Sequence, residues 1–334
     1  ILMQASVREM SVFGKGGISV KHTGDPDGAP PSYYNKFLPD ILPPEGRNYG
    51  AYAGGAANIA STYDFRARNT AGQQTLSGVI AGGDIIIEAA HPNPGDTLIN
   101  VLGITQILGA GHIDVLANGD IALTEKDGDL RVGRIMSTAN DVLLYSPQRM
   151  IDALNDAGVG VIADISGESI TLVAGSGLVN PPGTAENPMG YDAGMPLGGI
   201  GAADNFIEID VDIRPSVGPV GVLRAYDTTA GYTDGIFLDE VSGDMQVHTV
   251  DTIADVSLRT VAGSILDARN DDDSNIFGQT VDLDANGSGS SIGQTGNDLE
   301  IDSRRGSPAG VDDVGLEATN NIFLTETDGN LRLV

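Results

Sequence analysis

The sequence Ile121-Ala-Leu-Thr-Glu-Lys-Asp-Gly-Asp-Leu-Arg-Val132 returns twice in recognisable form along the chain. The second copy is Ile236-Phe-Leu-Asp-Glu-Val-Ser-Gly-Asp-Met-Gln-Val247, and the third is Ile322-Phe-Leu-Thr-Glu-Thr-Asp-Gly-Asn-Leu-Arg-Leu333. We call these twelve residues the phrase. In each copy, apolar residues two apart are followed by a glutamate and then by a glycine. Residues two apart face the same side of a strand and glycine tolerates the backbone of a corner, so each copy predicts a strand that ends in a corner.

Shorter segments of the chain have the same form. Gly83-Asp-Ile-Ile-Ile-Glu88, Gly111-His-Ile-Asp-Val-Leu116, Gly119-Asp-Ile-Ala-Leu123 and Asn140-Asp-Val-Leu-Leu144 each join a Gly or Asn corner to a short strand. The chain has 334 residues, of which 46 are glycine and 5% are aromatic. Many short strands separated by glycine-rich corners give such a composition, so we predict an all-β fold.

The spacing of the copies shows where the repeat gains residues. The first two copies lie 236−121 = 115 residues apart and the last two 322−236 = 86 residues apart. Four further segments pair between the repeats: Ile170–Leu172 with Val281–Leu283, Gly199–Gly201 with Ser291–Gly293, Phe206–Asp210 with Asp298–Asp302, and Val222–Ala225 with Gly315–Ala318. The extra residues of the longer repeat fall mainly within 173–199 and 227–235, which are loop-like. Strands that keep their register while loops absorb insertions are typical of a solenoid.

Strand landmarks at Leu238, Leu258, Leu283, Ile301 and Leu324 divide the 86-residue repeat into four steps averaging 86/4 = 21.5 residues. We therefore predict a parallel β-helix (β-solenoid) with about 15 turns of roughly 20–25 residues each. The general preference of parallel crossover connections predicts a right-handed winding. The prediction is one solenoid segment over residues 1–334, with a loop excursion at 21–57 and a loop insertion at 173–199.

One segment predicts a helix instead of a strand. Ser146 is a favourable N-cap, Pro147 suits the first helical position, and apolar residues follow at Met150, Ile151 and Leu154. We expect a short surface helix over residues 146–157. The counterpart in the next repeat, residues 260–268, carries a glycine inside and predicts a strand and a corner.

The chain carries 46 acidic and 18 basic residues, which give a net charge of −28. Such a surface repels nucleic acid and anionic membranes and attracts cations. No apolar stretch is long enough to span a bilayer, so we expect no membrane span in this segment. The chain begins Ile-Leu-Met-Gln and stops within the third phrase, so we expect it to be a piece of a longer protein.

The phrase glutamates Glu125, Glu240 and Glu326 allow two interpretations. A carboxylate at the end of a strand can accept the amide hydrogens of the following corner, which is a structural cap. Alternatively, in the first copy, Glu125 could form a cation site with Asp127 and Asp129.

A second set of carboxylates predicts a metal site. In Ile207-Glu-Ile-Asp-Val-Asp-Ile213 the acidic residues Glu208, Asp210 and Asp212 share the outer face, and Glu300 and Asp302 repeat this one unit later. Carboxylates about 7 Å apart along a strand, beside similar ones on neighbouring turns, could bind Ca²⁺, which prefers several oxygen ligands. The alternative is an ordinary solvated strand face.

The phrase resembles a known class of repeat. Leu-Thr-Glu-x-Asp-Gly-Asn/Asp-Leu-Arg, together with Asp-Val-x-Leu, Ser-Ile-Leu-Asp-Ala and Asn-Asp-Leu-Glu-Ile-Asp-Ser, resembles repeats in giant bacterial surface proteins of the filamentous-haemagglutinin and large-adhesin kind. The resemblance covers residues 80–334 and is clearest over 235–334. It implies an exported, extracellular β-helix on the cell surface, and it transfers no catalytic residue.

Two functional hypotheses follow. The first is a structural segment of an extracellular adhesin or surface filament, with neighbouring solenoid segments, copies of itself, surface glycans or cell-surface proteins as partners. It predicts no enzyme activity, no catalytic residue and no cofactor other than Ca²⁺. The alternative is a carbohydrate-active β-helix enzyme that uses outer-face carboxylates such as Glu208, Asp210, Glu300 and Asp302.

Overall fold

The computed structural model describes part of the chain in two compact units, residues 1–144 and 145–334. The described residues are 2–5, 12–14, 18–22, 49–53, 57–61, 67–68, 74–75, 78–81, 85–89, 101–107, 112–117, 120–125, 128–155, 162–175, 177–178, 191–192, 198–214, 220–228, 235–305 and 313–334. Side chains are described from residue 112 onward. Within these residues the secondary structure consists of strands, bridges, turns and bends, and no helix is long and apolar enough to cross a membrane.

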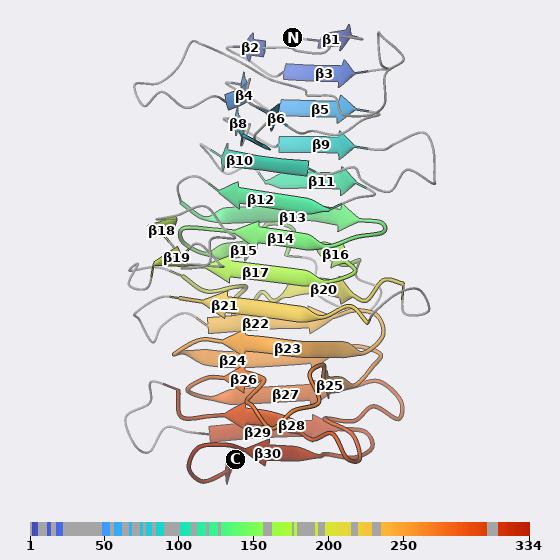
Figure 1. The fold of residues 1–334 in the computed structure, drawn as a ribbon, viewed down its shortest axis with the longest axis vertical. Coiled ribbons are helices and arrows are strands. Elements are labelled where there is room, and N and C mark those ends of the chain that lie inside the picture. Colours follow the sequence, from blue (N-terminus) through green and yellow to red (C-terminus); the bar gives the residue numbers. More distant parts are fainter. Residues whose placement is uncertain are drawn as a thin grey trace. The chain divides into compact units, whose positions relative to one another are not determined.

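The first unit contains two parallel sheets and a small hairpin (Figure 1). One sheet has the order β1 (Leu2–Ala5), β3 (Ile18–His22), β5 (Ala57–Ser61), β9 (Ile85–Ala89), β11 (Ile113–Ala117) and β13 (Leu130–Ser137). The other has the order β2 (Val12–Gly14), β4 (Tyr49–Ala53), β8 (Gly78–Ala81), β10 (Val101–Ile107), β12 (Ile121–Glu125) and β14 (Val142–Tyr145). Strands β6 (Ala67–Arg68) and β7 (Gln74–Thr75) pair antiparallel.

The second unit repeats this arrangement. Its first sheet has the order β16 (Ile165–Gly167), β20 (Ile207–Val211), β22 (Gly235–Glu240), β24 (Asp255–Thr260), β27 (Val281–Ala285), β29 (Asp313–Ala318) and β31 (Arg332–Leu333). Its second sheet has the order β17 (Ile170–Ala174), β21 (Leu223–Asp227), β23 (Met245–Asp251), β26 (Ile276–Phe277), β28 (Leu299–Asp302) and β30 (Leu324–Glu326). Two short strands lie beside these sheets, namely β15 (Met150–Asp152) and β25 (Ile265–Asp267), and β25 pairs with β23.

Neighbouring strands in each sheet are parallel, and the chain alternates between the two sheets. This confirms the prediction of an all-β parallel β-helix. Its handedness stays a prediction.

Apolar residues stack in register to form the core. In the first sheet of the second unit Leu238 pairs with Leu258 and Leu258 with Leu283, and all three are fully buried. In the second sheet Val250, Ile276 and Ile301 form an equivalent column. Burial alternates along the strands, as in β27, so the inward residues of both sheets form the core. Each such side chain contributes about 1.5–3 kcal/mol by leaving water.

The repeat is offset by half a turn. The second phrase begins in β22 of the first sheet, whereas the third begins in β30 of the second sheet. Three further pairs of matched segments also exchange sheets: β17 with β27, β20 with β28, and β21 with β29. From β22 the first sheet advances three turns to β29, and β30 adds half a turn. The 86 residues therefore make 3.5 turns of about 25 residues and not four turns of 21.5, because the step from Leu283 to Ile301 crosses between sheets.

The corner of the phrase is confirmed. Gly128, Gly243 and Gly329 have φ angles of 90°, 78° and 98°, a region that side chains with a Cβ rarely adopt. The position of the phrase glycine therefore follows from backbone geometry.

The helix predicted over 146–157 is wrong within the described residues, 146–155. The Ser146 hydroxyl donates to the Arg149 carbonyl at 2.9 Å, and the chain then enters β15. The Met150 amide donates to the Gly199 carbonyl at 3.0 Å, so ladder pairing overrides the local helical signal. The strand expected over residues 260–268 is present as β25, and the two repeats therefore agree here.

Only parts of the two predicted loop regions fall within the described residues. In the 21–57 region, residues 49–53 form β4 and pair in parallel with β2. In the 173–199 region, β18 (Gly177–Leu178) and β19 (Tyr191–Asp192) form an antiparallel pair outside the parallel sheets. Residues 21–22 belong to β3, residue 57 to β5 and residues 173–174 to β17, and residues 175, 198 and 199 are also described. The remaining residues of both regions lie outside the described ones.

Candidate functional site

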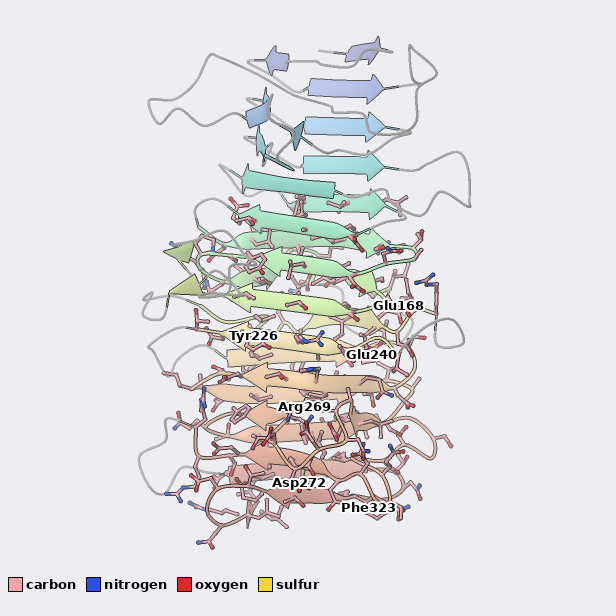
Figure 2. The ribbon with its side chains drawn as sticks, viewed as in Figure 1. Glu168, Tyr226, Glu240, Arg269, Asp272 and Phe323 are labelled. Carbon is pink, nitrogen blue, oxygen red and sulfur yellow. The ribbon has the colours of Figure 1, made fainter. Side chains whose placement is uncertain are left out.

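Glu240, the phrase glutamate at the end of β22, links two turns by hydrogen bonds. Glu240 is fully buried, and its Oε1 accepts the amide of Ser242 in the following corner at 3.3 Å. Its Oε2 accepts the amide of Val211, at the end of β20 in the preceding turn, at 3.1 Å (Figure 2). Burial raises the pKa of this carboxyl well above its usual value, and the two amides act in the opposite direction. The carboxylate is therefore the predicted cap and also a link between turns.

Glu326 repeats the link in the third phrase. Its Oε1 accepts the Ser303 amide at 3.1 Å and its Oε2 accepts the Ser303 hydroxyl at 2.6 Å. Ser303 follows Asp302 as Val211 follows Asp210, so both glutamates bind the same repeat position. Glu125 of the first phrase is 1% exposed. A structural role explains these hydrogen bonds without a cation.

A buried carboxylate cluster lies beside β20. Asp152, Asp164 and Glu208 are 3%, 0% and 1% exposed, and one oxygen of each lies within 4.8 Å of the others. Asp152 accepts the amides of Leu154 and Asn155 at 2.7 Å each. Asp164 accepts the Glu208 amide at 3.4 Å. Backbone hydrogen bonds therefore hold the carboxylates of Asp152 and Asp164 in place.

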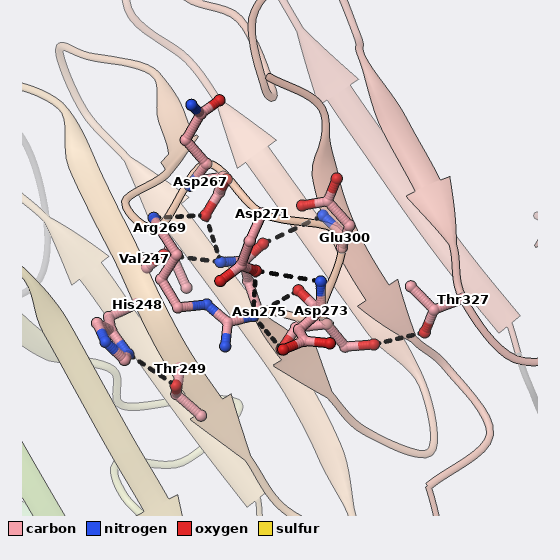
Figure 3. A network of polar contacts seen from close by, with 12 residues as sticks. Val247, His248, Thr249, Asp267, Arg269, Asp271, Asp273, Asn275, Glu300 and Thr327 are labelled. Atoms are coloured by element: carbon pink, nitrogen blue, oxygen red, sulfur yellow. Dashed lines mark hydrogen bonds and ion pairs between the residues drawn. The ribbon is translucent and has the colours of Figure 1, made fainter. Parts of the chain in front are cut away.

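The next repeat builds the same arrangement with one substitution. Asp267 accepts the amides of Arg269 and Asn270 at 2.7 and 2.6 Å, as Asp152 does with its own loop. Asn275 stands in the place of Asp164, and its Oδ1 accepts the Glu300 amide at 3.2 Å. Its Nδ2 donates to Asp267 at 2.6 Å and to the Val247 carbonyl at 3.2 Å (Figure 3). We call this second set, Asp267, Asn275 and Glu300, the asparagine site.

The two versions differ in charge at one buried position. Asn275 places a neutral amide where the cluster on β20 has the acid Asp164. The amide also donates hydrogen bonds, which an ionised aspartate cannot do. The cluster of Asp152, Asp164 and Glu208 holds three acids within the same backbone frame. The cluster on β20 and the asparagine site therefore allow the effect of one buried charge to be compared within one chain.

Glu300 is the acidic residue that faces outward from the asparagine site. Its side chain is 7% exposed, and its Oε2 accepts no hydrogen bond from any described residue. Burial and, next, the negative charge of Asp267 raise the pKa of Glu300 to about 7. An ionised carboxylate is therefore costly here unless a further positive group approaches it.

A cavity of about 560 Å³ opens beside Glu300. Its walls include the carboxylates of Asp271, Asp272 and Asp298. A second cavity of about 320 Å³ is lined by Asp210, Asp212 and Asp244. In this second cavity Asp212 accepts the Gly221 amide at 3.1 Å and Asp244 accepts the Ser264 amide at 2.7 Å.

The five carboxylates expected to bind calcium do not converge on one point. Glu208 lies in the buried cluster on β20, whereas Asp210 and Asp212 lie in the smaller cavity. Glu300 lies on β28 in the other sheet, and Asp302 accepts the Arg304 amide at 3.0 Å. The four carboxylates named for a carbohydrate-active site are divided in the same way and line no common groove.

The sequence analysis did not identify Asp152, Asp164, Asp271, Asp272 or Asp298 as neighbours of the predicted carboxylates. A signal was present. Asp152-Ala-Leu-Asn155 and Asp267-Ala-Arg-Asn270 are nearly identical, and each ends in a residue with positive φ. The motif was hidden because the first copy also matches a helix start.

Comparisons with protein-family models, curated proteins and solved structures found no match to this chain. The function must therefore be argued from the site and the fold.

Proposed function

We propose that this chain is a rigid structural segment of an extracellular bacterial adhesin or surface filament. The adhesin class comes from the resemblance of the phrase. The support from the fold is a stack of parallel strands in which each turn covers the one before it. Stacking of this kind provides length and stiffness, and the function of such a segment lies in the contacts made by its ends and faces.

The observation that carries the proposal is that one turn buries the apolar residues of the turn beside it. Ile322, Leu331 and Leu333 are 44%, 40% and 62% exposed. Their counterparts in the second phrase, Ile236, Met245 and Val247, are fully buried. The difference is that the next turn covers the second phrase, with Val256 on Ile236 and Ile265 on Met245.

The occupant that fits this surface is another solenoid turn. Strands β30 and β31 are the last in their sheets and present a free edge, to which a parallel strand can add. A turn with apolar residues at the same spacing would also cover the exposed leucines. Neighbouring solenoid segments or copies of this chain are the partners that this proposal names, whereas the net charge of −28 disfavours nucleic acid.

Sedimentation velocity over a concentration series tests end-to-end association. We expect the chain to self-associate and the double variant Leu331→Lys with Leu333→Lys to sediment as a monomer, because the charges would be buried at the contact. Val261→Lys is the matched control, since Val261 is 45% exposed outside the last turn. A wild-type chain that remains monomeric at about 100 µM, which corresponds to about −5.5 kcal/mol, would contradict the proposal.

A further inference from the structure

The cavity beside Glu300 has the composition of a cation site. Four carboxylates line it, those of Asp271, Asp272, Asp298 and Glu300, and Asn270 and Asn297 add amide groups. Among the described residues, no lysine, arginine or aromatic side chain lines this cavity. The field in the cavity is therefore strongly negative, and oxygen is the main ligand atom available.

An acidic lining alone occurs on many surfaces, but Glu300 adds a second observation. Its carboxylate is more than nine-tenths buried and lines the cavity, and its Oε2 has no hydrogen-bond donor among the described residues. Glu240, a buried glutamate on β22, accepts two backbone amides instead. A buried carboxylate oxygen without a donor loses its hydration without gaining a hydrogen bond.

The nearest arginine does not supply the missing positive charge. Arg269 directs one guanidinium nitrogen to the carbonyls of Asp273 and Ser274, and the same nitrogen lies 3.4 Å from Asp271 (Figure 3). The amide of Asn275 is committed to Asp267 and Val247. Neither Arg269 nor Asn275 therefore supplies a hydrogen-bond donor to Oε2 of Glu300.

We propose that the cavity beside Glu300 binds a divalent cation of the calcium class, with Glu300 and Asp298 as carboxylate ligands and Asp271 or Asp272 completing the site. Calcium takes six to eight oxygen ligands in flexible geometry, which suits carboxylates carried on a strand and on a loop. An organic ammonium group would favour an aromatic wall, which the cavity lacks among the described residues.

The site would join two parts of the fold. Asp298 directly precedes β28 and Glu300 lies in it, whereas Asp271 and Asp272 lie in the loop after β25. A bound cation would therefore hold this loop against the strand of the following turn. The inference does not depend on the filament role, since a monomeric chain can be tested.

Calorimetric titration of CaCl₂ into the chelator-treated chain tests the site. We expect saturable binding with a Kd of about 10⁻⁴–10⁻³ M, the range of extracellular calcium modules. Glu300→Gln keeps the shape of the side chain and should weaken binding by at least about tenfold. Glu317→Gln is the matched control, because Glu317 is exposed on β29 in the other sheet, and it should bind as the wild type does.

Two further variants keep the result decisive. Asp298→Asn changes a half-exposed residue that accepts a hydrogen bond from the Thr325 hydroxyl at 3.1 Å, and it should weaken binding in the same direction. Glu208→Gln alters the buried cluster on β20 and should leave this binding intact. The proposal fails if the wild type shows no saturable heat, if Glu300→Gln binds as the wild type does, or if Glu208→Gln alone removes the signal. It also fails if NaCl of equal ionic strength gives the same heat.

Discussion

Replacing Asn275 by aspartate should destabilise the second unit, and the structure gives the size of the effect. Asn275 is fully buried and donates from Nδ2 to Asp267 at 2.6 Å and to the Val247 carbonyl at 3.2 Å. Ionised aspartate donates to neither. A hydrogen bond to a charged group contributes about 1.5–3 kcal/mol and a neutral one about 0.5–1.5 kcal/mol. The substitution also places a second negative charge against Asp267, so we expect a total loss of about 3–5 kcal/mol at pH 7.

The pH dependence of this loss has a definite sign. Burial beside Asp267 would raise the pKa of the new carboxyl above its ordinary value of about 3.9. The folded variant would then bind more protons than the unfolded chain, so its stability falls as pH rises above that value. At lower pH the protonated carboxyl can donate to Asp267 again and recovers part of the loss.

Urea unfolding followed by circular dichroism, in the presence of a chelator, measures the effect at pH 7 and pH 5. The matched control is Asp164→Asn, which copies the asparagine site into the cluster on β20 and should stay within about 1 kcal/mol of the wild type or exceed it. Asn275→Asp within about 1 kcal/mol of the wild type at pH 7 would refute the reasoning, because the buried amide would then contribute little.

Two further predictions concern the phrase. Burial raises the pKa of Glu240 above its ordinary value of 4.5, so the free energy of unfolding should fall as pH rises from that value. Glu240→Gln should reduce this dependence on pH. Equal slopes of unfolding free energy against pH for the variant and the wild type, from urea unfolding between pH 5 and pH 8, would contradict the prediction. Gly243→Ala should cost about 1–2 kcal/mol from its positive φ alone, because no atom lies near a Cβ there. Gly263→Ala should cost at least about 1 kcal/mol more, because its Cβ would meet the Gly243 carbonyl. Equal decreases in melting temperature for the two variants would disprove this difference.

The fold could be predicted because its rules are local. Alternation such as Val281-Asp-Leu-Asp-Ala285 indicates a strand with one buried face, and a repeated glycine at Gly128, Gly243 and Gly329 indicates a corner. The cap role of the phrase glutamate follows from the same local geometry. Its second hydrogen bond, from Val211 to Glu240, could not be predicted without knowing which strand lies beside β22.

The candidate site could be predicted only in part, because it depends on which strands are neighbours. Outer-face parity placed Glu208 and Glu300 correctly on the side of their strands away from the core. Their near-complete burial was not predictable, since it comes from Asp152, Asp164 and the loop at 268–275, which lie far away in sequence. The helix expected at 146–157 failed for a related reason, since a bridge from Met150 to Ile200 decides that conformation.

The half-turn offset explains why equivalent carboxylates do not gather. In both sheets of a parallel β-helix, every second residue of a strand points inward. A strand sequence therefore carries no information about which sheet it joins. A repeat of 3.5 turns therefore preserves every core position while moving each outer-face residue to the opposite sheet. Glu208 on β20 and Glu300 on β28 are such a pair. Successive repeats thus place the same outer-face chemistry on alternate faces of the solenoid, and a ligand or partner that binds one repeat must reach the opposite sheet to find its equivalent in the next.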